Sequence, residues 1–328
     1  MRHKSVSYAK YGYIFCIPFV LAFLIFSLYP IIYTALIGFT DFKGIGQVEF
    51  NFLANPFQNF EMVLKNPSFQ KSLRNTVLIW IINFIPQILL ALLLTAWFTS
   101  HRRKIKGQGL FKVLFYMPNI ITAATIAILF SSLFGYPMGP VNDLFKTLGI
   151  SEEPIQFLMS KWTARGIVAF IQFWMWYGYT MIVLISGVLG MNPELFEASE
   201  IDGASGAQTF FFVTLPNLRT ILLYTLITSM IGGLQMFDIP RLFLLGGPDN
   251  ATLTASVFIY NQAFSGSYLH NRAAAASMIL FVIIAILAAI VFYIMRDKDS
   301  VQLNKDRRNQ EKALKKAEKA ARRNVNET

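Results

Sequence analysis

The chain has 328 residues, of which 55% are hydrophobic, 15% are aromatic and only 14% are charged. Soluble domains carry nearer a quarter of their residues as charged side chains, because these cover the surface that faces water. The composition therefore excludes an ordinary soluble protein and indicates that lipid surrounds much of the chain. A formal net charge of +11 would suit a nucleic-acid-binding protein, but the positions of the charges argue against that class.

Six long runs without Asp, Glu, Lys or Arg follow one another along the chain. A helix needs roughly 20 apolar residues to cross a bilayer, and each run supplies that length or nearly so. We therefore expect an all-α polytopic membrane protein with six transmembrane helices. The runs are 11–40, 75–101, 113–142, 166–193, 220–237 and 273–295. A seventh uncharged run, 251–271, is rich in Asn, Thr, Ser and Gly, so we predict a loop there.

The basic residues are distributed unevenly between the segments that join these runs. With the N-terminus in the cytoplasm, 20 of the 29 Lys and Arg residues fall on the inner side, in 1–10, 102–112, 194–219 and 296–328. The positive-inside rule therefore predicts that both termini are cytoplasmic. The first run is longer than the apolar region of a cleaved signal peptide, and no small-x-small site follows it, so we expect it to be retained as a membrane helix.

The chain offers few groups for catalysis or metal binding. Its single cysteine, Cys16, cannot form a disulfide within the chain, and its histidines, His3, His101 and His270, are far apart in sequence. No expected span carries the ionisable group on which a secondary transporter usually depends, and Cys16 alone would not equip a membrane-embedded enzyme. No G-x-x-x-x-G-K-[ST] phosphate loop occurs, so ATP hydrolysis would need a separate subunit. We expect no catalytic residue, metal or cofactor in this chain.

The segment 192–216, on the expected cytoplasmic side, has the local features of two short helices joined by a bend. Asn192-Pro193-Glu194 favours a helix start, because Asn can cap it, Pro suits the first turn and an acid suits the positive end of the helix dipole. Gly203 permits a break, and Ser205-Gly206-Ala207-Gln208 has the spacing of a capping box for a second helix. Pro216 falls near the end of that helix.

The same segment resembles a known motif. Glu197-Ala198-Ser199, three residues, Gly203, nine residues and Val213-Thr214-Leu215-Pro216 is similar to the EAA loop of the permease subunits of binding-protein-dependent ABC importers. The pattern of that family is Glu-Ala-Ala, three residues, Gly, nine residues, Ile, one residue, Leu-Pro, and every spacing matches. Ser199 in place of Ala and Val213 in place of Ile are the departures, and both are small changes in volume.

Further residues resemble the carbohydrate branch of the family, the maltose-type permeases. They are Asn75-Thr76 in the second run, Met117-Pro118-Asn119 in the third, Glu200-Ile201-Asp202-Gly203-Ala204 in the loop, and Gly246-Gly247-Pro248, Tyr260 and Phe264 beyond the fifth run. The resemblance is good over about residues 70–295. It implies the ABC importer type I permease fold, with an N-terminal segment at 1–70 that holds the first transmembrane helix and outer loop, a permease core at 71–295 that contains the coupling loop 192–216, and a basic cytoplasmic tail at 296–328.

In this family the EAA loop docks as a coupling helix in a cleft of the ATPase subunit. The resemblance therefore implies a role in ATPase coupling for Glu197, Ala198, Ser199, Asp202, Gly203, Ala204, Leu215 and Pro216. An ordinary interfacial helix with a good cap is the alternative interpretation. The resemblance also implies a second homologous permease subunit, ATP-binding cassette ATPase subunits that use the ATP, an extracytoplasmic sugar-binding protein and membrane lipid as partners, and no nucleic acid.

Neutral polar and aromatic side chains within the expected spans are suited to binding a sugar. The equivalent stretches of maltose-type permeases line the substrate cavity, so the resemblance places Asn119, Thr122, Trp176, Tyr177, Thr180, Gly233 and Gln235 on the substrate pathway. We expect Trp176 and Tyr177 together to offer a flat apolar surface. Hydrogen bonding and packing between helices is the alternative for each of these residues.

The sequence thus predicts the permease subunit of an ATP-driven sugar importer in the bacterial cell membrane, forming half of the translocation pathway. A neutral oligosaccharide is the expected solute, because no span carries a charge at its centre. A non-sugar solute such as a polyol or glycerol phosphate is the alternative, and a secondary transporter a more distant one. The tail segment 304–324 favours a helix that is either solvated or in contact with anionic lipid head groups.

Overall fold

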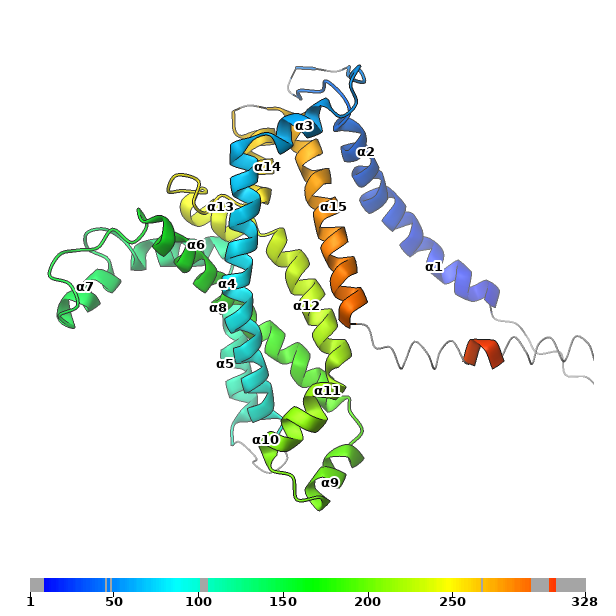
Figure 1. Ribbon diagram of the computed structural model, residues 1–328, viewed down its shortest axis with the longest axis vertical. Coiled ribbons are helices and arrows are strands. Elements are labelled where there is room, and N and C mark those ends of the chain that lie inside the picture. Colours follow the sequence, from blue (N-terminus) through cyan, green and yellow to red (C-terminus); the bar gives the residue numbers. More distant parts are fainter. Residues whose placement is uncertain are drawn as a thin grey trace, which may run out of the picture. The chain divides into compact units, whose positions relative to one another are not determined.

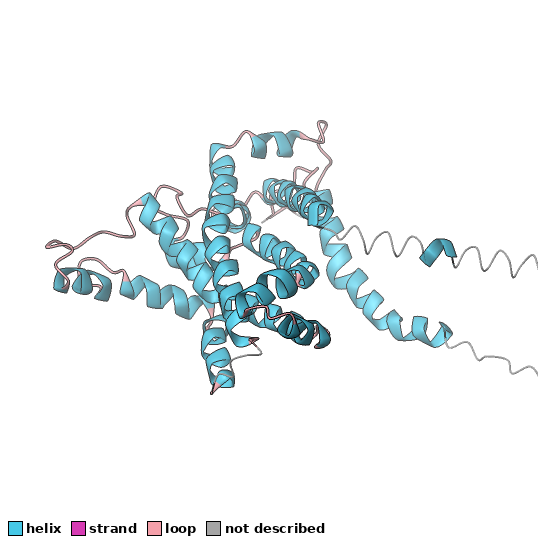
Figure 2. Ribbon diagram, turned by 60° about the horizontal axis from the view of Figure 1, so that its bottom comes forward, coloured by secondary structure: helices cyan, strands magenta, loops and turns pink. Residues whose placement is uncertain are grey.

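The computed structural model describes residues 9–44, 46–47, 49–100, 106–266, 268–295 and 307–310. The named elements in these ranges are all helical, and the β pairing within them is an isolated bridge between Thr40 and Phe52 (Figure 2). The all-α prediction is confirmed. Of the tail helix expected at 304–324, residues 307–310 are helical and the rest lies outside the described residues.

The helices are labelled in Figure 1, and their bounds are as follows. They are α1 (Ala9–Phe23), the π-helical η1 (Leu24–Leu28), α2 (Tyr29–Ile37), α3 (Gln58–Leu64), α4 (Pro67–Phe98), α5 (Gln108–Ile120), α6 (Ala123–Leu133), α7 (Pro140–Thr147), α8 (Lys161–Leu189), α9 (Glu194–Ile201), α10 (Gly206–Gln208), the π-helical η2 (Thr209–Thr214), α11 (Leu215–Asn217), α12 (Arg219–Leu234), α13 (Asp238–Leu244), α14 (Ala255–Phe264) and α15 (His270–Met295).

Five stretches of the described chain are long and apolar enough to cross a membrane: Tyr11–Ile37, Pro67–Phe98, Lys161–Leu189, Arg219–Leu244 and His270–Met295. The third expected span, at 113–142, is not one straight helix. It consists of α5 and α6, which are bent by 90° at a short break, and counting this pair as one span gives six. The break has a local cause, because Thr122 has extended backbone geometry and its side chain accepts a hydrogen bond from the Thr125 amide, which starts α6 in a new direction.

The loop predicted at 251–271 is a second point at which the structure differs from the sequence prediction. Residues Ala255–Phe264 form the helix α14, which the Thr254 side chain caps by accepting from the Val257 amide. The polar residues of this run suggested a loop, but Val257 and Phe258 are buried and hold the segment as a helix. Burial against other helices therefore overrides the local composition here.

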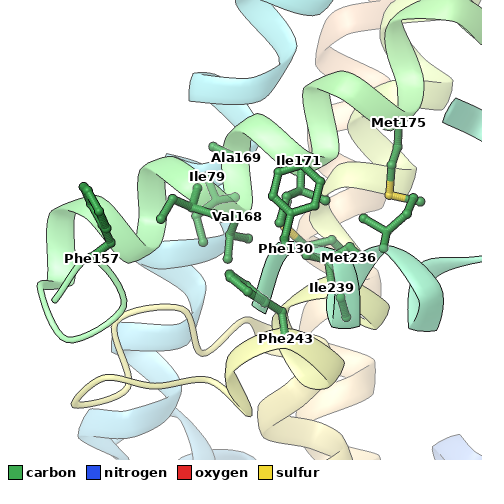
Figure 3. Close-up of a cluster of buried hydrophobic side chains, with 13 residues drawn as sticks. Ile79, Phe130, Phe157, Val168, Ala169, Ile171, Met175, Met236, Ile239 and Phe243 are labelled. Carbon is green, nitrogen blue, oxygen red and sulfur yellow. The ribbon is translucent and has the colours of Figure 1, made fainter. Parts of the chain in front are cut away.

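The described residues pack as two compact units. The first draws on Met1–Pro86, Ile120–Met175 and Ile231–Ile286, and the second on Gln87–Asn119, Trp176–Met230 and Leu287–Thr328. Helices α4, α5, α8, α12 and α15 contribute residues to both. In the first unit α13 packs along α6, and a core of buried apolar side chains joins them to α4 and α8 (Figure 3). Ile79, Val168, Ile171 and Ile239 in this core are each at most 1% exposed.

The first unit also contains a loop that is held by hydrogen bonds from distant residues. The Asn75 side-chain amide of α4 donates to the carbonyl oxygens of Asn250 and Leu253, at 2.7 and 3.0 Å. Thr76 accepts from the Ala255 amide at 2.9 Å. Two motifs that were recognised separately in the sequence therefore form one structural feature: the Asn75-Thr76 pair holds the loop that follows Gly246-Gly247-Pro248.

In the second unit, the backbones of α5 and α8 come into direct contact at Gly178. A β-carbon at Gly178 would overlap the carbonyl oxygen of Phe115, so only glycine fits between the two helices. Small residues at helix contacts are typical of membrane proteins, in which close van der Waals packing replaces the hydrophobic effect as the cause of helix association. Gly166, on the same helix α8, has no atom within 4 Å of the position of a β-carbon.

We predict that Gly178→Ala destabilises the protein by about 1–3 kcal/mol, because a backbone carbonyl cannot move aside as a flexible side chain can. The matched variant Gly166→Ala should be neutral or slightly stabilising, because alanine favours helix over glycine. Thermal unfolding of the two purified variants in the same detergent would compare them. Equal unfolding temperatures would show that the α5–α8 contact is not as close as the structure has it.

Candidate functional site

The segment that resembles the EAA loop forms the helix, bend and helix that the sequence predicted. Asn192 is not the N-cap of the first helix, α9, as the sequence predicted, but it lies just before it: its side-chain oxygen accepts from the Glu194 amide at 3.1 Å and its nitrogen donates to the Glu194 carboxylate at 3.0 Å. Pro193 occupies the N-cap position, so α9 begins one residue later than the sequence suggested. The acids Glu194 and Glu197 lie in the first turn, where the helix dipole favours negative charge.

The bend depends on the backbone of Gly203. Its φ is +75°, a conformation that costs other residues energy, and its amide donates to the Glu200 carbonyl. A β-carbon at Gly203 would meet nothing within 4 Å. The backbone angle, rather than space, is therefore the reason for glycine at this position.

The second helical part begins at the predicted capping box. The Gln208 amide donates to the Ser205 hydroxyl, and the Ser205 amide donates to the Gln208 side chain at 2.7 Å. Helical structure then continues through α10, η2 and α11 to Asn217. The hydroxyls of Ser199 and Thr209 lie 3.2 Å apart and share a hydrogen bond, so the serine that replaces the alanine of the motif links the two helical parts.

Apolar packing holds this loop against the end of α8. Phe196 and Leu218 form a buried cluster with Val188, and a β-carbon at Gly187 would lie 2.8 Å from a methyl group of Leu218. The loop is thus attached to a long helix by close contacts on its inner side. Movement of the loop would be passed directly to α8.

The coupling residues expected from the motif are distributed over the outside and the inside of the loop. Glu197, Ala198, Asp202, Gly203 and Pro216 are exposed, Ala204 and Leu215 are half-buried, and Ser199 is buried. Large apolar side chains that the motif does not include are also exposed: Ile201, Phe211 and Phe212 are 86%, 60% and 78% exposed. The sequence could have identified these three residues, because large apolar side chains are unusual in a segment that is predicted to lie in the cytoplasm. The exposed surface therefore combines carboxylates with apolar groups.

The residues expected on the substrate pathway fall in both units. In the first unit, Thr122 caps α6, and Gln235 is exposed at the end of α12. Gly233 lies against the indole of Trp80, which a β-carbon there would overlap. The absence of a side chain at Gly233 therefore allows the close packing of α12 on α4 at this point.

In the second unit, Asn119 lies half-buried on α5, and the other three expected residues lie on α8 in different environments. Thr180 is 2% exposed and accepts a hydrogen bond from the side-chain nitrogen of Gln87 at 2.8 Å. This contact favours the alternative interpretation of Thr180, in which it serves hydrogen bonding between helices rather than the substrate pathway. Tyr177 is 8% exposed, whereas Trp176 is 44% exposed. The expected flat surface made by Trp176 and Tyr177 together is not found, because successive residues of a helix point about 100° apart.

Trp176 pairs instead with Tyr179, one helical turn further on. Their rings are T-shaped at a centroid distance of 6.0 Å, and the Tyr179 side chain lies close to that of Tyr224 on α12. Tyr179 and Tyr224 are 36% and 53% exposed. Neither tyrosine was among the residues predicted from the sequence, although the spacing of three residues between Trp176 and Tyr179 places them on one face of a helix. We call Trp176, Tyr179 and Tyr224 the aromatic cluster.

Comparison with known proteins places the chain in a family. Residues 63–298 match the family described as binding-protein-dependent transport system inner membrane component. The chain belongs to this family. The resemblance that the EAA-like loop indicated is confirmed, and the protein is a multi-pass component of the inner membrane.

Relatives with named transport functions match most of the chain. The lactose transport system permease protein of Rhizobium radiobacter is 31% identical over 289 residues, which cover 88% of this chain and 94% of the relative. The arabinooligosaccharides transport system permease protein of Bacillus subtilis (strain 168) is 30% identical, with 86% of this chain and 88% of the relative covered. The crystal structure of a bacterial ABC transporter involved in the import of the acidic polysaccharide alginate contains a similar chain, with a TM-score of 0.70 at 22% identity over 87% of this chain and 94% of that one. This likeness confirms the predicted permease fold.

The contact between Thr180 and Gln87 generates a prediction about the expected pathway. Thr180→Val keeps the shape of the side chain but leaves the buried Gln87 amide without an acceptor, so we expect a loss of about 1–3 kcal/mol of stability. Thr180→Ser keeps the hydroxyl and should retain most of that stability. Thermal unfolding in detergent measures both. An unchanged unfolding temperature for Thr180→Val together with a selective loss of solute uptake would contradict the packing role.

Proposed function

We propose that this chain is the permease subunit of an ATP-driven importer of neutral oligosaccharides, and that it forms half of the translocation pathway. The observation that carries the proposal is its match along most of its length to permease proteins named for lactose and arabinooligosaccharide transport. ATP is hydrolysed by a separate ATP-binding cassette subunit, and this chain contributes no catalytic residue or cofactor of its own.

The aromatic cluster supports a sugar as the solute. Trp176, Tyr179 and Tyr224 together offer exposed ring faces and hydroxyl groups from two helices of the second unit. Sugars bind through both kinds of contact, since their C–H faces stack on aromatic rings and their hydroxyls form hydrogen bonds. A charged solute would call for a compensating charge within the membrane, and none lies at the centre of a span in this chain.

The geometry of the 192–216 loop supports a role in coupling. A short helix transmits a displacement only if it is rigid, and this one is held by the capping box, by the Ser199–Thr209 hydrogen bond and by the packing of Phe196 and Leu218. Its exposed residues include the acids Glu197 and Asp202 and the apolar residues Ile201 and Phe212. We propose that this surface docks on the ATPase subunit, with Glu197 facing a basic or hydrogen-bonding group there.

Further partners follow from the family and from the exposed apolar surface. In the first span, Tyr11–Ile37, no residue of the most apolar stretch is buried within the described chain. Lipid and a second, homologous permease subunit would cover it. An extracytoplasmic sugar-binding protein delivers the solute, and both termini lie in the cytoplasm, as the distribution of Lys and Arg favours.

Cysteine labelling tests the orientation and the docking together. In a chain whose native cysteine is removed (Cys16→Ser), we introduce Glu197→Cys in the loop and Glu153→Cys as an exposed control on the predicted outer side. We expect an impermeant maleimide to label position 153 in intact cells and position 197 only after permeabilisation. The ATPase subunit should slow labelling at 197, and a bulky label there should abolish ATP-dependent uptake. Labelling of 197 in intact cells, or at a rate that the ATPase does not change, would refute the proposal.

Uptake by the reconstituted transporter tests the solute. We expect neutral oligosaccharides to enter and phosphorylated sugars not to enter. Trp176→Ala should lower the uptake rate by roughly fivefold, since an aromatic contact contributes about 1 kcal/mol. Trp97→Ala is the matched control, because Trp97 is 47% exposed, close to the 44% of Trp176, and lies outside the aromatic cluster. Binding of the sugar to the isolated binding protein, measured by calorimetry, should be unchanged by either variant. Equal uptake rates for the two variants would show that the aromatic cluster is not part of the translocation pathway.

A further inference from the structure

The first unit contains a cavity of about 510 Å³ where α4 and α8 begin. Its volume is within the range of sites that bind small ligands. The cavity is lined by Pro67, Gln70, Lys71, Arg74, Asn75, Leu78, Trp162 and Arg165. None of these residues belongs to the coupling loop or to the aromatic cluster.

The wall of the cavity is basic. Lys71, Arg74 and Arg165 line it, and no acidic side chain does. The nearby carboxylate of Asp249 is paired with Lys161 at 3.0 Å, and the hydrogen bond from Lys161, with a smaller contribution from the charge of Lys71, lowers the pKa of Asp249. This single acid is therefore shared between Lys161 and the wall. The positive charge of the wall is therefore left without an equal negative charge.

The three cations are held in different ways. Arg165 is fixed, because it donates to the Ala251 carbonyl at 2.8 Å and to the Asn75 side chain at 2.9 Å, and its guanidinium lies 5.3 Å from the ring centre of Trp162. Lys71 donates to the carbonyl oxygen of Asp249. Arg74 is exposed and makes no hydrogen bond or ion pair to any part of the chain that the structure describes. Arg74 is thus available to a ligand.

The cavity lies where two candidate membrane spans begin. The candidate spans Pro67–Phe98 and Lys161–Leu189 both begin at its edge. The α4 residues Gln70, Arg74 and Leu78 recur every four positions, so one face of the helix changes from polar to apolar as it enters the span. Trp162, which is 69% exposed, adds an aromatic ring of the kind found at the level of lipid head groups.

We propose that this cavity binds the phosphate-bearing head group of an anionic phospholipid. Arg74 and Lys71 face the phosphate, Gln70 offers hydrogen bonds to the glycerol, and Leu78 and Trp162 contact the start of the acyl chains. A soluble phosphate would use the cations but not the apolar wall. Because Lys71 and Arg165 also hold the carbonyl groups of Asp249 and Ala251, the bound lipid would lie against the residues that fix the 249–253 loop. This site does not depend on the identity of the transported solute.

Fluorescence quenching tests the site in the complete transporter, reconstituted in phosphatidylcholine vesicles that contain brominated phosphatidylglycerol or brominated phosphatidylcholine. The chain has five tryptophans, so the signal of Trp162 is the difference between the native chain and Trp162→Phe. We expect this signal to be quenched more by the brominated phosphatidylglycerol. Equal quenching by the two lipids would overturn the proposal.

Two charge variants make the test specific. Arg74→Gln should reduce the preference for phosphatidylglycerol by roughly fivefold, as expected for the loss of one cation near an anionic head group. Lys146→Gln, which removes an exposed cation of α7 that does not line the cavity, should leave it unchanged. An equal effect of the two variants would indicate a general attraction of the surface and overturn the proposal.

Two further arms separate the lipid from other ligands. Inorganic phosphate at millimolar concentration should leave the preference for phosphatidylglycerol unchanged. If phosphate abolished this preference, the cavity would be a site for free phosphate and the lipid proposal would fail. If Arg74→Gln lowered binding of the solute-binding protein in pure phosphatidylcholine vesicles while the lipid preference was absent, the cavity would belong to a protein interface and the proposal would fail.

Discussion

The hydrocarbon core of a bilayer contains no water, so each backbone N–H and C=O there must find its partner within the protein. This constraint accounts for the helical structure of the described chain. It also accounts for the polar side chains that the spans tolerate. Four of these side chains donate a hydrogen bond to the carbonyl oxygen four residues earlier: the hydroxyls of Thr76, Thr95 and Thr225 and the side-chain amide of Asn83. Each of these groups thus has a partner within its own helix, and the Thr76 hydroxyl in addition accepts from the Ala255 amide.

Where a helix breaks, a side chain takes over the unpaired backbone groups. Thr122 does so at the sharp bend between α5 and α6, and Thr254 does so at the start of α14. Asn75 and Arg165 satisfy carbonyl groups of the loop before α14. The irregular backbone at these places is thus satisfied partly by side chains at the start of the following helix and partly by polar side chains of other helices. Two of these side chains, Asn75 and Arg165, also line the basic cavity, so one set of residues both holds the loop and forms the proposed lipid site.

Helix packing in each unit depends on small residues because lipid gives no hydrophobic advantage to contact between helices. Because Gly178 has no side chain, the backbone of α5 can approach it closely, and the indole of Trp80 packs against Gly233 for the same reason. Gly187 admits Leu218, through which the coupling loop is attached to α8. In the second unit, a displacement of the loop would therefore reach α8, the helix that carries Trp176 and Tyr179. This connection supports the proposal that the loop and the aromatic cluster act in one transport cycle.

The sequence by itself determined the features that depend on neighbours within about five positions. Charge-free runs predicted the membrane spans, which number six if α5 and α6 are counted as one. The capping box and the bend at Gly203 predicted the form of the loop, because each involves hydrogen bonds between nearby residues. The EAA-like spacing over 197–216 identified the family by resemblance. The bend between α5 and α6 has a local cause at Thr122 that the charge-free pattern did not reveal, and only the tertiary structure decided the helical state of α14. It also decided that Tyr179 lies close to Tyr224 of α12, that Thr180 binds Gln87, and that Lys71, Arg74 and Arg165 share a cavity. These features depend on which faces of distant helices meet, and a pattern of nearly uniform hydrophobicity does not specify which faces those are.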